Sequence, residues 1–80
     1  MTTKQALESV PILHRTKLEE YSSIIAYANE VGAEMYRNKI RGYLDCMVDM
    51  NIITKSARQT LFMWYAFSRV NRLKDSSQRV

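Results

Sequence analysis

Few side chains of this chain have the chemistry of a catalytic or metal-binding group, and they are scattered. His14 and Cys46 are its only histidine and cysteine, the residue types that titrate near neutral pH or act as strong nucleophiles. His14 precedes the first helical pattern with no neighbour to orient it, and Cys46 lies at the flank of an apolar helical face, which favours a place at the edge of the core. Asp45 and Asp49 stand one helical turn apart, but no histidine or cysteine completes a metal-binding set with them. We therefore expect no catalytic residue, no metal and no cofactor.

Length and composition favour one small helical domain. Eighty residues are close to the size at which a single hydrophobic core is just sufficient. Two glycines and one proline are too few for an all-β fold with many turns, and a hydrophobic share of 46% is too high for a disordered chain. The longest apolar run is the segment 61–67, far short of the roughly 20 residues that span a bilayer. A lone cysteine and an N-terminal sequence without a secretion signal favour a cytoplasmic protein that does not enter membranes.

The spacing of apolar residues predicts an all-α fold of two or three helices, arranged as a hairpin or bundle. The predicted helices span about residues 17–31, 33–50 and 55–73. Residues 1–15 are expected to form an irregular arm, because a proline interrupts them. Residues 74–80 are polar and are expected to fray.

Capping residues mark the expected starts of two helices, whereas the boundary near Gly32 is ambiguous. Thr16 and Glu19 have the spacing of a capping box for the first helix, and Thr54 is placed to cap the last one. Gly32 permits two interpretations. It could end the first helix in a left-handed conformation, or it could lie inside one long helix over residues 17–50, because the apolar stripe stays in phase across it.

The last predicted helix is apolar on all sides over residues 61–67. Its apolar residues divide into two faces, with Phe62, Met63, Ala66, Phe67, Val70 and Leu73 on one and Ala57, Leu61, Trp64 and Tyr65 on the other. One face is expected to cover the preceding helices. The other would then bind a partner through Leu61, Trp64 and Tyr65, and a chain of this size favours a homodimer because it has difficulty burying both faces alone.

Charge is distributed unevenly along the chain. Residues 1–34 contain three basic and five acidic side chains, whereas residues 35–80 contain nine basic and three acidic ones. On the last helix, basic side chains would surround the ring of Tyr65 and suit a phosphate backbone with stacked bases. The candidate nucleic-acid-binding residues are Lys55, Arg58, Arg69 and Arg72. A second interpretation is that the two oppositely charged halves attract each other.

Residues 40–54 resemble a helical hairpin found in small uncharacterised accessory proteins of bacterial phages and conjugative elements. In those proteins a GYLDAL helix is followed by a G-x-I-T turn, and this chain has Asn51 in place of the turn glycine and retains Thr54. The resemblance implies a mobile-element accessory protein without indicating an activity. We therefore expect a non-catalytic regulatory or accessory protein that acts by protein–protein interaction, with nucleic-acid binding as the alternative.

Overall fold

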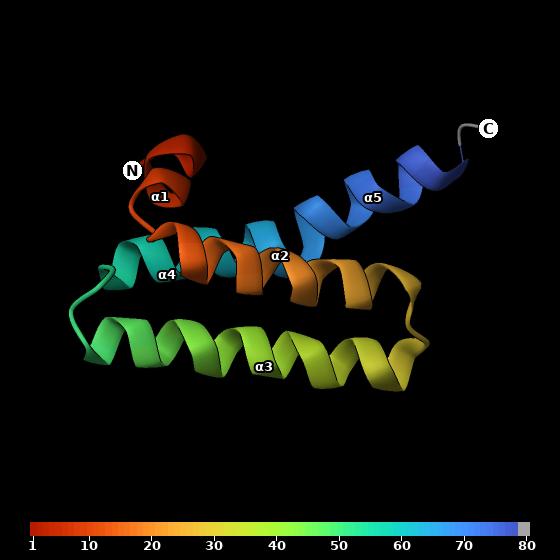
Figure 1. Ribbon diagram of the computed structural model, residues 1–80, viewed down its shortest axis with the longest axis horizontal. Helices are drawn as coiled ribbons and strands as arrows, with labels where there is room; N and C mark the ends of the chain where they lie inside the picture. Colours follow the sequence, from red (N-terminus) through yellow and green to blue (C-terminus); the bar gives the residue numbers. More distant parts are fainter. Residues whose placement is uncertain (79–80) are drawn as a thin grey trace.

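The computed structural model describes residues 1–78, and every secondary-structure element within them is helical. Figure 1 shows α2 and α3 running side by side in opposite directions, with α4 behind α2 and α5 leading away from the bundle. The last three elements follow one another without a break, so they form one long helix interrupted by a π-helical turn. The elements are α1 (Thr3–Glu8), α2 (Ile12–Tyr27), α3 (Glu30–Asp49), α4 (Lys55–Met63), η1 (Trp64–Ser68) and α5 (Arg69–Gln78).

The expectation of an irregular arm over residues 1–15 is wrong. Thr2 and Gln5 form a capping box that starts α1, and α1 contributes a buried residue, Ala6, to the core. Pro11 precedes the first residue of α2, a position where its missing N–H costs no helical hydrogen bond, and its carbonyl accepts bonds from two amides of the first turn. The expected cap, Thr16, instead lies within α2 and donates its hydroxyl hydrogen to the carbonyl of Ile12.

A sharp corner separates α2 from α3, so the continuous helix through Gly32 is not present. Ala28 has extended backbone angles, and the side chain of Asn29 caps α3 by accepting a hydrogen bond from the amide of Gly32 at 2.9 Å. Gly32 thus lies in the first turn of α3 and does not end α2. A Cβ atom at this position would approach the Cβ atom of Ala28 to 3.3 Å, so the corner is tightly packed.

The connection between α3 and α4 has the local structure that the sequence predicts. Asn51 has a φ angle of 59°, the left-handed conformation that commonly ends a helix. Thr54 caps α4 by accepting a hydrogen bond from the amide of Ala57 at 3.1 Å. Ile53 is buried and anchors the connection to the core.

The π-helical turn η1 changes which side of the last helix faces the core. A π-turn contains one residue more than an α-turn, so the helix after it is rotated by about 100° relative to an uninterrupted helix. From α4 into the turn the buried positions are Ala57, Leu61 and Tyr65, and from the turn into α5 they are Ala66 and Val70. Both apolar faces of the predicted helix therefore contact the same core, one after the other.

The polar residues after Leu73 are helical as far as Gln78. Residues 74–78 continue α5 and were expected to be frayed, whereas residues 79–80 of that predicted tail lie outside the described residues. Among residues 1–78, no helix combines the length and the apolar character needed to cross a bilayer.

Candidate functional site

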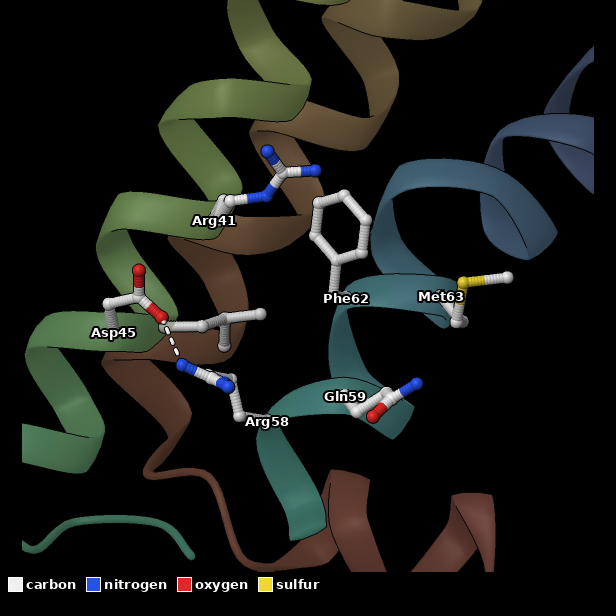
Figure 2. Close-up of a pocket in the computed structure, with 7 residues that line it drawn as sticks. Arg41, Asp45, Arg58, Gln59, Phe62 and Met63 are labelled. Carbon is white, nitrogen blue, oxygen red and sulfur yellow. Dashed lines mark hydrogen bonds and ion pairs between the residues drawn. The ribbon is translucent and has the colours of Figure 1, made fainter. Parts of the chain in front are cut away.

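A shallow hollow of about 340 Å³ lies between α3 and α4. Figure 2 shows Arg41 and Asp45 reaching it from α3 while Arg58 and Phe62 reach it from α4. An ion pair of 2.7 Å joins Arg58 Nη1 to Asp45 Oδ1, and both side chains are nearly half exposed. Solvent screens such a pair, so it positions the two side chains more than it stabilises the fold.

Two arginines of α3 lie over two phenylalanine rings of the C-terminal helix. The guanidinium of Arg41 is 4.9 Å from the centre of the Phe62 ring, and that of Arg37 is 5.6 Å from the centre of the Phe67 ring. Arg37 also donates hydrogen bonds to Glu34 and Glu30, which raise its pKa further. Within residues 1–78, by contrast, no carboxylate forms an ion pair with Arg41.

The π-helical turn brings the half-buried Phe62 and the exposed Phe67 together. Residues five apart in an α-helix point in different directions, but here the two rings meet edge to face with their centres 5.9 Å apart. Met63 is 51% exposed and Phe67 is 40% exposed. We call the surface formed by Phe62, Met63 and Phe67 the aromatic ridge. The apolar spacing of the sequence predicts that these residues cover the preceding helices, because nothing in the local pattern marks the π-turn.

Two of the three residues predicted to bind a partner are in the core. Leu61 is fully buried and Tyr65 is 1% exposed, so neither is accessible to another molecule in this fold. Trp64 is half-buried, with the guanidinium of Arg72 5.0 Å from its ring centre. The apolar run is therefore mostly covered by the chain itself. It does not need a second copy to bury Leu61 and Tyr65.

The residues predicted to bind nucleic acid do not form one stripe. Arg58 is paired with Asp45, and Arg69 donates a hydrogen bond of 2.7 Å to the carbonyl of Glu19. The π-turn rotates Arg69 away from the direction of Arg58, and the aromatic ring expected between them, that of Tyr65, is buried. The other two predicted residues, Lys55 at the start of α4 and Arg72 in α5, are exposed.

The two side chains considered first for chemistry also occupy unexpected places. His14 lies in α2 and is oriented by a hydrogen bond of 2.6 Å between its Nδ1 atom and the hydroxyl of Tyr43 in α3. The two rings meet edge to face, so the pair helps to join the two helices. Cys46 is exposed and not at the core edge, with its thiol 3.9 Å from the sulfur of Met50. Within residues 1–78, no three His, Cys, Asp or Glu side chains are placed to share a metal ion.

The buried phenol of Tyr65 should make the protein sensitive to alkali. Burial, and after it the charge of Glu19, raises the pKa of Tyr65 above its ordinary value of 10.0, and burial likewise raises the pKa of Tyr43. The neutral phenol is therefore favoured in the folded state. The free energy of unfolding should be constant with respect to these groups below about pH 10 and should fall as the pH rises above it, since the unfolded chain loses its phenol protons first.

Equilibrium urea unfolding between neutral pH and about pH 11 measures this effect. The free energy of unfolding of Tyr65→Phe should fall less steeply with pH than that of the wild type above about pH 10. Tyr27→Phe is the matched control, because it removes the hydroxyl of a tyrosine that is 72% exposed instead of buried. If the free energy of unfolding falls equally steeply above about pH 10 in the wild type and in Tyr65→Phe, the alkaline sensitivity does not come from Tyr65.

Comparison of the chain with protein-family models, curated proteins and solved structures found no match. The resemblance of residues 40–54 to mobile-element proteins therefore stays a prediction.

Proposed function

We propose that this chain is a non-catalytic accessory protein that binds a protein partner through the aromatic ridge. The observation that carries this proposal is the π-turn, which places the exposed ring of Phe67 against the half-buried ring of Phe62. π-Turns inside α-helices occur frequently at functional sites, because they displace side chains at a cost to the helix. Aromatic, methionine and arginine side chains are also the ones enriched in the centres of protein interfaces.

The surroundings of the aromatic ridge suit a binding surface. Met63 lines the hollow between α3 and α4 and also a second one, lined on its other side by Thr3 from α1 and by Trp64. Met63 of the ridge thus lines two shallow hollows that side chains of a partner could fill. Arginines and small polar side chains, including Ser56 and Ser68, line these hollows and would form a polar rim.

The test compares capture of proteins from the native host by the wild type and by variants of the ridge. Phe67→Ser with Met63→Ser should reduce capture of a specific partner, and loss of an interface anchor worth about 2 kcal/mol corresponds to about 30-fold weaker binding. Tyr27→Ser is the control, since it removes from α2 an aromatic ring that is 72% exposed, against 40% for Phe67. The proposal fails if the ridge variant is folded and captures the same proteins in the same amounts as the control.

The same preparation discriminates the alternative function. The excess of basic residues over residues 35–80 supports binding to nucleic acid, whose affinity would come from release of counterions. The 260/280 nm absorbance ratio of purified wild-type protein, followed by a salt titration with single- and double-stranded DNA, measures this directly. Salt-dependent binding that survives replacement of Met63 and Phe67 would favour nucleic acid over a protein partner.

A further inference from the structure

The side of α3 that faces away from the bundle is not covered by any described element. Figure 1 shows α3 along one edge of the molecule, with α2 on its inner side. Val31, Met35, Asn38 and Gly42 are spaced by four, three and four residues, which places them on one stripe of the helix. We call these four residues the outer face of α3. Val31 is 76% exposed and Met35 is 53% exposed, so the first half of this face is apolar and open.

Gly42 has no structural role inside the chain. Glycine is the least favourable residue in a helix interior apart from proline, and Gly42 lies in the middle of α3. A Cβ atom built on it would meet no other atom within 4 Å, in contrast to Gly32, whose Cβ would touch Ala28. The fold therefore has room for a side chain at residue 42. A close approach by another molecule is what a glycine at this place permits.

Opposite charges flank the outer face at one heptad spacing. Glu34 and Arg41 are seven residues apart on the flank of α3 that faces α4. The side chain of Glu34 is 61% exposed even though it accepts a hydrogen bond from Arg37. Arg41 is held over the Phe62 ring and has no carboxylate partner within residues 1–78. The flank thus presents one accessible carboxylate and one guanidinium that lacks a carboxylate.

We infer that this face binds a second copy of the chain, with the two α3 helices antiparallel about a two-fold axis. In that arrangement Val31 of each copy lies against Gly42 of the other, and Met35 lies against Asn38. Side chains on the same flank face each other in antiparallel helix pairs, so Glu34 of each copy meets Arg41 of the other. A second copy fits better than an unrelated partner, because the two-fold axis pairs Glu34 with Arg41 and Val31 with Gly42 at two symmetric places.

The outer face of α3 is separate from Met63 and Phe67, the exposed residues of the aromatic ridge on α4 and η1, and the flanking Arg41 is what links the two surfaces, through the Phe62 ring. It also differs from the dimer that the sequence predicted, which used the last helix. The ridge can bind its own partner in either oligomeric state, and variants at Gly42, which leave Arg41 and Phe62 in place, let the two proposals fail separately.

Sedimentation equilibrium with charge-reversed variants tests the pairing. The wild type should be dimeric, and Arg41→Glu or Glu34→Arg alone should raise the dimer dissociation constant about tenfold or more, because each sets like charges against each other twice. The double variant Arg41→Glu with Glu34→Arg should recover dimerisation, since the pair is restored with its signs exchanged. Lys17→Glu on α2 is the control and should remain dimeric.

Variants at residue 42 test the close approach without depending on charge. Gly42→Ala should raise the midpoint of thermal unfolding measured at low protein concentration, because alanine favours the helix, while Gly42→Leu should retain helical circular dichroism and lose the dimer. A monomeric wild type at about 100 μM, roughly 100-fold above a micromolar dissociation constant, would overturn the proposal. So would a folded Gly42→Leu that remains dimeric, or a charge-exchanged double variant that dimerises no better than its single parents.

Discussion

Replacing Leu61 with alanine is expected to lower the free energy of unfolding by about 2–5 kcal/mol. The side chain is fully buried in the core of the single chain, so its removal leaves a cavity as well as losing apolar contacts. Small domains have a total stability of about 5–15 kcal/mol, so this one change could remove much of it. Urea unfolding followed by circular dichroism at one fixed protein concentration measures the effect, and the fixed concentration separates it from dimerisation.

Met63→Ala is the matched control for Leu61→Ala. Met63 is two residues away on the same helix but 51% exposed, so its replacement should change the free energy of unfolding by less than about 1 kcal/mol. The two variants should therefore separate stability from partner binding, with Leu61→Ala affecting the first and Met63→Ala the second. A Leu61→Ala protein of unchanged stability that loses its partner would restore Leu61 to an interface.

Replacing Ser22 with alanine is expected to cost about 1–3 kcal/mol of unfolding free energy. Ser22 is fully buried, and its hydroxyl lies 2.6 Å from the carbonyl oxygen of Tyr65 and 3.2 Å from that of Leu18. The carbonyl of Tyr65 lies in the π-turn, where the regular α-helical bonding pattern is interrupted. Without the hydroxyl this buried carbonyl would lose its partner, which costs more than an ordinary surface hydrogen bond.

Ser23→Ala is the control for Ser22→Ala, because Ser23 also donates its hydroxyl hydrogen to a carbonyl four residues earlier but is only partly buried. Its replacement should leave the midpoint of urea unfolding nearly unchanged, within about 0.5 kcal/mol. If both serine variants lose the same stability, the loss comes from α2 itself and not from the contact with the π-turn. Wild-type stability in Ser22→Ala would show that the Tyr65 carbonyl finds another partner.

Local signals predicted the second half of the fold well. The structure confirms the helix over most of residues 33–50, the left-handed Asn51 and the Thr54 cap, because each depends on side chains within four residues of the backbone group that they satisfy. The same reasoning failed before residue 33. There, Thr16 and Gly32 have the residue types of helix boundaries but do not form them. Pro11 precedes α2 and Asn29 caps α3 instead.

The candidate site was the least predictable part of the chain. Arg41 and Phe62 lie far apart in sequence, and their contact exists only because α3 and α4 pack against each other. The ridge residues Phe62, Met63 and Phe67 were assigned to a core-covering face by counting at 100° per residue. That count is correct for each α-helical segment separately, but it fails across η1 because the π-turn inserts one additional residue.

The sequence by itself determined that this protein is all-α, where two of its helices lie and that its last helix has two apolar faces. Only the tertiary structure decided how those faces are used. The π-turn at residues 64–68 rotates the helix so that Leu61 and Tyr65, then Ala66 and Val70, contact one core in succession. The carbonyl of Tyr65 in this turn accepts a hydrogen bond from the hydroxyl of Ser22, which lies 43 residues earlier in the chain. A hydrogen bond across that separation has no local signature, so packing, not helix propensity, places the aromatic ridge at the surface.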